Sequence, residues 1–564
     1  MAKHMMMRSL RRWLSIAAML AGLNACGGGS SSSQAASPDF QISATALSPA
    51  AVTVGSSTSS TIAIASVDGF TGTVALACSG LPNGASCLFD PTSVAGSGTS
   101  QLTLSISTVG IPGSYSFSVQ GSSGSINHSL ALTLVVQAKI QHVVIIFQEN
   151  RSPDNLFHDQ NLINAGADIA SSGKNSKGQI IPLAKGTLQT NYDLGHTHRS
   201  FTEMYDDGAM DGADKISVSC AAGATNCPPA NAQYVYVDPA NVAPYFELAE
   251  TYTFGDRMFQ TNQGPSFPAH QFIISGTSAP TPPGNVTSDL FAAENMSPPT
   301  ANNATGCTAA ADVSVFLIDP SGNESQSVYP CFDHPTLTDL LDANQISWRY
   351  YAPGPGSIWT GPNAIKHMCV PNSTATECTG TDWTNSVVLQ SKQVLTDIAN
   401  GQLAGVTWII PDGAYSDHAL MNDGSGPSWV ASVVNAIGNS TFWSSTAIIV
   451  TWDDWGGWYD HVPPPSIYNS YEYGFRVPLI VVSPYAKAHY ISHVTHDFGS
   501  ILKFTETMFH LPVVDSSYAD ARADDLSDCF DFNQTPLSFK TINSALKAKF
   551  FMEDNRPPSP PDDD

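Results

Sequence analysis

The strongest constraint on the fold is a short apolar run that ends abruptly in polar residues. Residues 143–147 read Val-Val-Ile-Ile-Phe, a uniform β-branched run typical of a strand buried on both faces of a parallel sheet. Gln148, Glu149, Asn150 and Arg151 follow at once. Because ligands of open α/β sheets bind outside the carboxyl ends of the strands, Glu149 and Asn150 lie where a ligand would bind. A structural pair between Glu149 and Arg151 at a strand end is the alternative interpretation.

Strands and helices alternate through most of the chain that follows. The pattern predicts buried strands at 346–351, 406–410, 447–451 and 477–482, and helices at 337–344 and after an N-cap at Asp497. Between residues 138 and 551 we therefore expect an α/β domain, with a mostly parallel central sheet and helices on both faces.

Residues 39–137 differ in composition, being rich in Ser, Thr, Val and Gly with almost no Lys, Arg or His. Short alternating runs between turn signals predict a small antiparallel β-sandwich, which looks like the immunoglobulin-like (Ig-like) modules of exported bacterial proteins. No residue set there suggests chemistry, so we expect a spacer or an adhesive module. A Gly/Ser linker at 27–38 precedes it, and the Pro- and Asp-rich residues 552–564 predict a disordered acidic tail.

The first 26 residues have the features of a lipoprotein-type signal peptide. Basic residues precede the apolar segment 13–23, which is too short to span a membrane. Residues 23–26 read Leu-Asn-Ala-Cys and resemble a bacterial lipobox, in which Cys26 would carry the lipid that anchors the mature protein to a membrane. Simple secretion with cleavage nearby is the alternative. Both interpretations predict export, to the periplasm, the cell surface or the medium.

Export to an oxidising compartment makes local disulfides plausible. Lipidation of Cys26 would leave nine of the ten cysteines, of which Cys529 has no close neighbour in the sequence. The others fall into pairs that are close in sequence, although sequence does not fix the connectivity: Cys78 and Cys87, Cys220 and Cys227, Cys307 and Cys331, and Cys369 and Cys378. Their spacings lack the C-x-x-C pairs of a zinc site.

The chain carries a formal net charge of −25 at pH 7. This charge repels nucleic acid and anionic membrane surfaces, so nucleic acid is not an expected partner. It would also repel a phosphorylated substrate, whose binding would then need a local cation.

Asp453 and Asp454 indicate where such a cation would bind. Two adjacent carboxylates at the end of a buried strand repel each other unless a counter-charge is present. The alternative is an N-cap pair, but the glycines at 456–457 disfavour an immediate helix. Together with Glu149 and Asn150 these residues offer hard oxygen ligands, which favour a divalent metal ion such as Ca²⁺, Mg²⁺ or Mn²⁺.

Three histidines and one serine also have unusual surroundings. A lone histidine is usually structural, but His196, His418 and His461 each lie in a polar cluster beside a predicted strand end or a Gly-rich turn. Ser266 lies alone in the Gly/Pro turn at 264–268.

These segments resemble the motifs of the bacterial phosphoesterase family, which joins phospholipases C with acid phosphatases of the alkaline-phosphatase-like superfold. The matching segments are 149–154 (ENRSPD), 193–196 (DLGH) with MDG at 210–212, 264–268 (GPSFP), 451–465 (TWDDWGGWYDHVPPP) and 476–484 (RVPLIVVSP). The resemblance covers roughly residues 140–512, and the agreement of several motifs in order makes it specific.

The resemblance implies a role for each matching position. Glu149, Asn150, Asp453 and Asp454 would bind the metal, Ser266 would be both nucleophile and metal ligand, and His196, His418 and His461 would contact the phosphoryl group or the leaving oxygen. The implied reaction is hydrolysis of a phosphate mono- or diester through a phosphoseryl intermediate. Many phospholipase members carry a histidine where this chain has Phe498, so no role is carried over to that position.

Acid phosphatase and phospholipase C both remain open as functions. A lipid substrate predicts an apolar rim, for which four aromatic residues are candidates that could equally belong to the core: Trp452, Trp455, Trp458 and Tyr459. The alternative from another class is a catalytically inactive cell-surface binding protein with a phosphoesterase fold. A missing nucleophile or metal ligand would favour that alternative, and none is missing. No C-x-P-x-R motif is present, which argues against a sulfatase.

Overall fold

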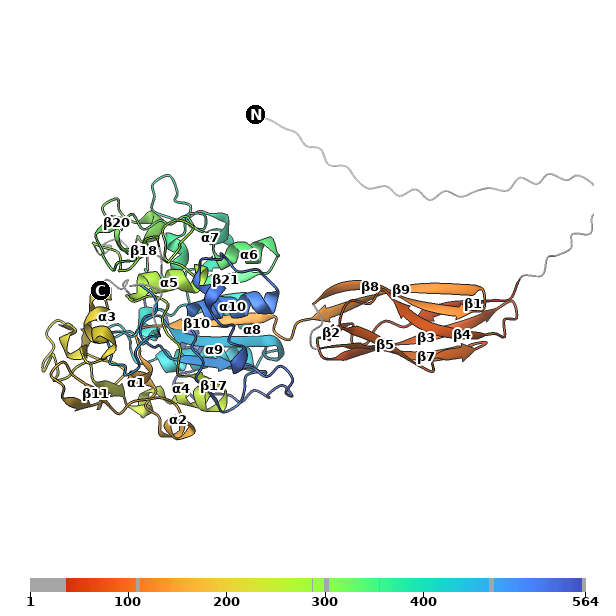
Figure 1. Cartoon of the computed structure of the whole chain (residues 1–564), viewed down its shortest axis with the longest axis horizontal. Helices are drawn as coiled ribbons and strands as arrows, with labels where there is room; N and C mark the ends of the chain where they lie inside the picture. The colour runs from red at the N-terminus through yellow and green to blue at the C-terminus, as the bar shows by residue number, and fades with distance from the viewer. Residues whose placement is uncertain are drawn as a thin grey trace, which may run out of the picture.

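The computed structural model describes residues 37–107, 112–286, 288–298, 304–354, 356–465 and 471–559. The predicted signal peptide, Cys26 and nearly all of the predicted linker lie outside these residues. The described chain forms an elongated all-β domain that projects from a larger α/β domain (Figure 1). Among the described residues, no helix is both long and apolar enough to cross a membrane.

The first domain is a β-sandwich whose strands pair antiparallel except for β2, which pairs in parallel with β9. One sheet has the order β1-β3-β7-β5 and the other β2-β9-β8-β4-β6. Alternating side chains from both sheets, such as Ile62, Leu102 and Leu134, fill a shared core. A disulfide between Cys78 and Cys87 joins the two sheets. The strands are β1 (Asp39–Ala44), β2 (Ala51–Thr53), β3 (Ser57–Val67), β4 (Thr73–Ser79), β5 (Ala85–Asp90), β6 (Ser93–Ala95), β7 (Gly98–Ile106), β8 (Gly113–Ser123) and β9 (Ile126–Gln137). The all-β prediction is confirmed here.

An eight-stranded sheet organises the α/β domain, with the order β22-β21-β23-β10-β24-β25-β17-β26. β10 pairs in parallel with β23 and β24, whereas β25 runs antiparallel to both of its neighbours. The strands are β10 (His142–Gln148), β17 (Thr253–Gly255), β21 (Trp348–Tyr351), β22 (Val387–Val388), β23 (Val406–Ile409), β24 (Thr446–Trp452), β25 (Leu479–Val482) and β26 (Tyr490–Ser492). The prediction of a mostly parallel sheet is confirmed, with β25 as its exception.

Helices cover both faces of this sheet. Figure 1 shows α5, α6 and α10 on one side and α4 and α9 on the other. Asp497 caps α10 by accepting from the Ser500 N–H at 3.1 Å, as the sequence predicts. The helices are α1 (Pro153–Leu156), α2 (Gln160–Ala165), α3 (His198–Tyr205), α4 (Pro239–Thr251), α5 (Ser266–Ser275), α6 (Leu337–Ala343), α7 (Thr381–Ser386), α8 (Gln393–Ala399), α9 (Gly426–Gly438), α10 (Phe498–Phe509), α11 (Ala519–Arg522) and α12 (Ala548–Glu553).

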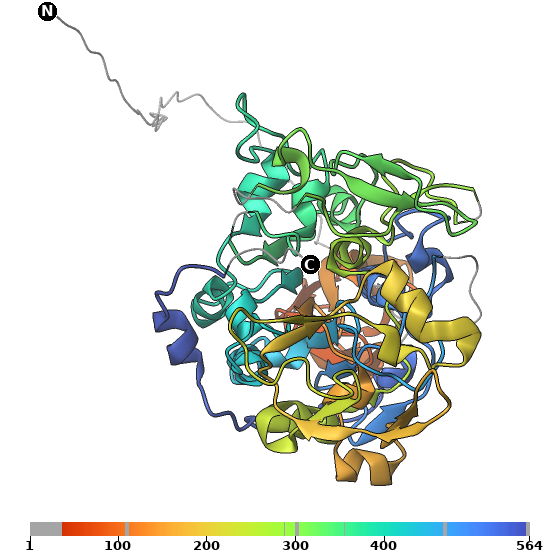
Figure 2. The same cartoon turned by 90° about the vertical axis from the view of Figure 1, so that its left-hand side faces the viewer.

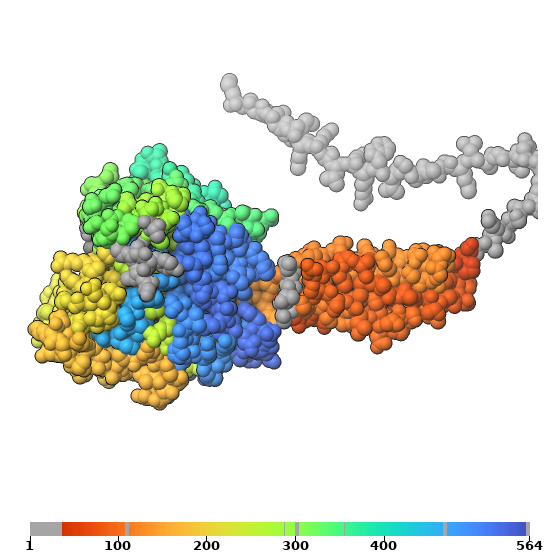
Figure 3. Space-filling view, in the orientation of Figure 1, coloured from red at the N-terminus to blue at the C-terminus, as the bar shows by residue number. Residues whose placement is uncertain are grey.

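Insertions surround the end of the sheet that faces away from the sandwich. Figure 2 views this end, and the yellow and green segments of the chain lie around it. In Figure 3 they form separate lobes below and above. Their short strands are β11 (Ser172–Lys174), β12 (Ile180–Pro182), β13 (Ala184–Gly186), β14 (Tyr192–Leu194), β15 (Val218–Cys220), β16 (Val235–Val237), β18 (Phe291–Ala292), β19 (Val315–Ile318) and β20 (Gln326–Val328).

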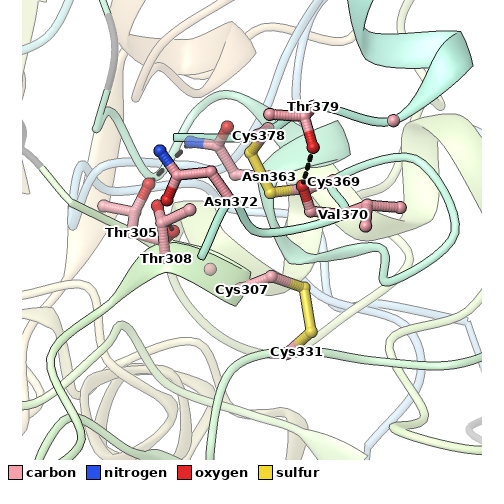
Figure 4. The surroundings of a disulfide bond; sticks show 12 residues. Thr305, Cys307, Thr308, Cys331, Asn363, Cys369, Val370, Asn372, Cys378 and Thr379 are labelled. Carbon is pink, nitrogen blue, oxygen red and sulfur yellow. Dashed lines mark hydrogen bonds between the residues drawn. A yellow bond between two sulfur atoms is a disulfide. The ribbon is translucent and has the colours of Figure 1, made fainter. Parts of the chain in front are cut away.

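Disulfide bonds cross-link these insertions. The lobe that carries β18, β19 and β20 is called the green lobe, from its colour in Figure 3. It contains the disulfides Cys307–Cys331 and Cys369–Cys378, near which Asn363 donates to the Thr305 hydroxyl (Figure 4). Cys220–Cys227 closes a loop in the lobe that carries β11–β16, yellow in the same figure. With Cys78–Cys87 these are the four pairs that are close in sequence, so the prediction of local disulfides is confirmed. Cys529 is buried and free.

One expectation needs correction, and one open alternative is decided. Residues 552 and 553 complete α12, and residues 554–559 make ordered contacts, since Ser559 donates to Asp412 from its backbone N–H at 3.0 Å and from its hydroxyl at 2.9 Å. The prediction of a disordered tail therefore does not describe residues 552–559. For the four aromatic residues that the sequence assigns either to an apolar rim or to the core, burial inside the domain supports the core: Trp452, Trp455, Trp458 and Tyr459.

Candidate active site

Four predicted ligand residues meet where β10 and β24 end. Because these strands pair in parallel and in register along their length, Glu149 and Asn150 come to lie beside Asp453 and Asp454. The backbone N–H of Asn150 donates to Asp453 Oδ1 at 2.8 Å, and all four side chains are fully buried. Segments about 300 positions apart in sequence thus form one polar cluster inside the domain.

A tight turn holds the second half of this cluster in place. Gly456 has a φ of 62°, and a Cβ there would lie 2.3 Å from the Asn150 carbonyl oxygen, so only glycine fits. The Gly456 N–H donates to Asp454 Oδ1 at 2.6 Å. The Gly-Gly sequence after the two aspartates therefore serves to fold the chain back over the end of β10.

Ser266 faces this cluster from the first position of α5. Its hydroxyl donates to Asp454 Oδ2 at 3.3 Å, and its side chain is fully buried. Asn295 Oδ1 accepts from the Phe267 N–H at 2.9 Å and so holds the first turn of the helix. The amino end of a helix carries partial positive charge, which favours an anionic group beside Ser266.

The donor atoms fit a divalent cation. Burial and the adjacent Asp453 carboxylate raise the pKa of Asp454 to about 8. Within the part of the chain that the structure describes, Asn150 Oδ1 and Asp453 Oδ2 are buried without a hydrogen-bond partner. Buried oxygens of this kind cost free energy unless a cation or a proton occupies the space between them. A metal ion coordinated by these oxygens would offset both the repulsion and the lost hydration.

His270 also belongs to this cluster, although sequence reasoning did not select it. Its Nε2 lies 3.4 Å from Glu149 Oε1 and 3.9 Å from Asp453 Oδ2, and its side chain is fully buried. One donor atom from each of these three residues lies within 4.8 Å of the others. The available signal was spacing, because residues four apart share a helix face and His270 follows Ser266 by four positions.

His196 and His418 lie together beside the cluster. Their ring centroids are 5.9 Å apart, and His196 Nε2 is 3.2 Å from Asn150 Nδ2. His196 Nδ1 is 2.8 Å from the Leu194 carbonyl oxygen, which fixes the orientation of the ring. Trp359, from the green lobe, packs against His418 with ring centroids 5.8 Å apart.

Arg151 connects the segments that carry these residues. Its guanidinium is fully buried, and Nε and Nη2 donate to the Asp417 carbonyl oxygen at 2.9 and 2.6 Å. Nη2 also donates to the Leu188 carbonyl oxygen at 2.9 Å, and Nη1 donates to Asn155 Oδ1 at 3.1 Å. The end of β10, the loop before His418 and the segment that leads to His196 are thereby held together.

The structure does not bring His461 into this group. Its ring nitrogens lie 2.8 Å from Asp154 Oδ2 and 2.9 Å from Asp168 Oδ1. Although burial opposes the charged form, the bond to Asp154 raises the pKa of His461 to about 9. Arg476 completes the network with two 2.9 Å bonds to Asp460. His461 therefore supports the loop after β24, at a place separate from Ser266.

A sequence model of the phosphoesterase family matches residues 140–512, which include every segment of this site. The chain belongs to the phosphoesterase family. Its curated relatives include the hemolytic phospholipase C of Pseudomonas aeruginosa, 24% identical over 74% of this chain and 61% of the relative. Phospholipase C B of Mycobacterium tuberculosis is 23% identical over 70% of this chain and 78% of the relative. The first-named alignment leaves more than a third of the Pseudomonas protein uncovered.

Proposed function

We propose that the protein is an exported, metal-dependent phosphoric ester hydrolase with Ser266 as its nucleophile. The observation that carries the proposal is the position of the Ser266 hydroxyl, 3.3 Å from Asp454 within a buried carboxylate cluster at the amino end of α5. The family and the names of its relatives support phosphoric ester hydrolysis. The mixed sheet with its site at the strand ends also supports an alkaline-phosphatase-like superfold.

The residues of the site would have different roles in such a reaction. Glu149, Asn150, Asp453 and Asp454 would hold the metal, which would lower the pKa of the Ser266 hydroxyl and offset charge on the phosphoryl group. The amino end of α5 stabilises the same negative charge. Attack of Ser266 Oγ on phosphorus breaks the bond to the leaving oxygen and gives a phosphoseryl intermediate, which water then hydrolyses to release phosphate or a phosphate ester.

In this proposal His196 and His418 transfer protons in both steps. The His196 ring is held by the Leu194 carbonyl, with Nε2 directed toward Asn150. One imidazole protonates the leaving oxygen, and the same site later accepts a proton from the attacking water. His461 has no part in this proposal, because its ring is engaged by Asp154 and Asp168.

Two substrate classes follow from different observations. Relatives named phospholipase C support a phospholipid substrate. Phe498, buried at the start of α10 where many phospholipase members carry histidine, favours a simpler phosphomonoester. Initial rates on p-nitrophenyl phosphate, p-nitrophenyl phosphorylcholine and phosphatidylcholine, each with and without chelator, separate the two. Absence of turnover on all three would favour the alternative of a catalytically inactive cell-surface binding protein.

Variants of Ser266 and Asp453 test the mechanism. Ser266→Ala should abolish turnover while retaining much of the metal, because four oxygen ligands remain, whereas Asp453→Asn should lose metal and activity together. The double variant should be little slower than the worse single one, since residues that act as a unit are not additive. Ser275→Ala is the matched control, because Ser275 is equally buried in α5 and donates to the Gln271 carbonyl oxygen. If Ser266→Ala retained more than about a tenth of the wild-type kcat, it would have lost less than about 1.4 kcal/mol of transition-state stabilisation. That loss is too small for the removal of a covalent nucleophile.

Export and anchoring are proposed from the sequence. Residues 23–26 and the Gly/Ser linker support a lipid on Cys26, with the Ig-like sandwich as a spacer between membrane and catalytic domain. Detergent-phase partitioning of the wild type and of Cys26→Ser tests this. Equal partitioning of both into the aqueous phase would rule out the anchor and leave simple secretion.

A further inference from the structure

His270 lies where a metal ligand would lie, and no motif of the family assigns it a role. Its imidazole comes from α5, whereas the carboxylates it approaches come from the ends of β10 and β24. Because one helical turn separates Ser266 from His270, α5 presents both side chains to the same carboxylate cluster.

The distances around His270 match the spacing of ligands on one small cation. Metal–nitrogen and metal–oxygen bonds of about 2.0–2.2 Å with angles of about 90–110° place neighbouring ligand atoms about 2.9–3.5 Å apart. His270 Nε2 is 3.4 Å from Glu149 Oε1, inside that range, and 3.9 Å from Asp453 Oδ2, slightly beyond it. The three atoms therefore need only a small approach to share an ion.

Packing fixes the ring in this orientation. His270 is fully buried, and its ring meets the edge of Phe147 with centroids 4.9 Å apart and planes at 84°. Phe147 belongs to β10, two residues before Glu149. The strand that supplies one ligand thus also sets the direction of the imidazole, so little conformational entropy would be lost on metal binding.

We propose that His270 is a nitrogen ligand of the catalytic metal, alongside Glu149 and Asp453, and that the site is therefore built for a first-row transition metal ion rather than for Ca²⁺ or Mg²⁺. Imidazole suits Zn²⁺ and Fe²⁺, whereas Ca²⁺ and Mg²⁺ take oxygen ligands. The oxygen ligands alone favour Ca²⁺, Mg²⁺ or Mn²⁺, so recognition of His270 changes the expected metal. The inference rests on the proposed metal dependence, but it concerns binding and is tested without substrate.

The experiment uses full-length protein stripped with chelator and reloaded with one equivalent of Mn²⁺ as a paramagnetic probe. Electron spin echo envelope modulation detects a directly coordinated ¹⁴N nucleus. The wild type should show this coupling, and His270→Gln should lose it. His334→Gln is the matched control, because His334 is also buried but lies outside the cluster, where its Nδ1 is 3.1 Å from the Pro335 carbonyl oxygen. Circular dichroism verifies that each variant is folded.

Affinity provides a second readout. Isothermal titration should show that His270→Gln weakens Zn²⁺ binding by at least about tenfold and changes Ca²⁺ binding by less than about threefold, since only the former ion gains from nitrogen. Mn²⁺ bound to the wild type without ¹⁴N coupling would overturn the proposal and make His270 an ion-pair partner of Glu149. A nitrogen-coupled site in a protein that hydrolyses no ester would instead refute the proposed function and leave this inference standing.

Discussion

Replacement of Arg151 by lysine tests whether the positions of His196 and His418, the proposed catalytic histidines, depend on a buried guanidinium. The side chain donates to three acceptors: the carbonyl oxygens of Asp417 and Leu188, and Asn155 Oδ1. It also lies over the Trp458 ring, with 4.9 Å from its central carbon to the ring centroid. A lysine ammonium keeps the positive charge but lacks the planar fork that reaches all three acceptors.

The magnitude follows from the acceptors left without a donor. If lysine satisfies one of the three, two hydrogen bonds to a charged donor are lost, each contributing about 1.5–3 kcal/mol. Arg151→Lys should therefore lower the free energy of unfolding of the α/β domain by about 3–6 kcal/mol, similar to the cost of breaking a buried ion pair. The loop that carries His418 would also shift, and a displacement near 1 Å should lower kcat/KM by about 100-fold.

Urea denaturation followed by tryptophan fluorescence measures the first effect. All tryptophans except Trp13, in the predicted signal peptide, lie in the α/β domain, so the signal of the protein without that peptide reports this domain. Arg199→Lys is the matched control, because Arg199 is 85% exposed and pairs with Glu203 in the same helix, so its replacement should change stability by less than about 0.5 kcal/mol. An Arg151→Lys protein that loses less than about 1 kcal/mol and keeps kcat/KM within about threefold would refute this reasoning.

Three further predictions concern stability and domain roles. Burial and then Asp520 raise the pKa of Glu506 to about 8 from 4.5, so the folded state holds a proton that the unfolded state releases. The free energy of unfolding should therefore fall as pH rises through this interval, and thermal melts should show a smaller decline in Glu506→Gln than in the wild type. A chain that ends at Glu553 loses the hydrogen bonds from Ser559 to Asp412. Its melting temperature should therefore drop, and its kcat should fall by about threefold or more. Unchanged values of both would contradict a supporting role for residues 554–559. A chain that begins at Ala138 should keep its kcat/KM on a soluble ester, and a loss beyond about tenfold with the fold intact would count against the sandwich as a spacer.

The sequence predicts those strands that are buried along nearly their whole length on both faces. β10 and β24 are buried on both faces, so their apolar runs are continuous and their polar ends stand out. The three-residue strands β17 and β26 carry too few residues for a pattern, and the reversed direction of β25 leaves no mark in composition. The direction of a strand in the sheet depends on how the chain connects it to its neighbours. The residues of the strand itself do not indicate that direction.

Side-chain partners were the harder part of the site. Glu149 and Asp453 could be predicted to meet, because both follow buried strands of one parallel sheet. The partners of His461 could not, since Asp154 in the short helix α1 and Asp168 in the loop after α2 reach it only through the tertiary fold. The order of residues 554–559 also depends on distant groups, among them Tyr415, which donates to Asp554 at 2.5 Å. Composition alone favours disorder there, and only the tertiary contacts reverse it.

Two neighbouring clusters show why the same residue types lead to different chemistry. Asp154, Asp460 and the partly exposed His461 form a set of the same residue types as the fully buried Glu149, Asp453 and His270. Arg476 enters the first set and bonds both oxygens of Asp460 at 2.9 Å, so its counter-charge is supplied by the chain itself. Among the described residues, no lysine or arginine forms an ion pair with Asp453 or Asp454.

The counter-charge of the second set must then come from a proton or from a bound cation. A proton held by Asp454 would leave Ser266 beside a neutral carboxyl, which does not activate a hydroxyl group. A divalent cation would relieve the repulsion, would activate Ser266 as the proposed nucleophile and would attract a phosphoryl group to a chain with a net charge of −25. Arg476 therefore distinguishes a structural ion-pair network from the cluster of Glu149, Asp453 and His270, which we propose binds a metal.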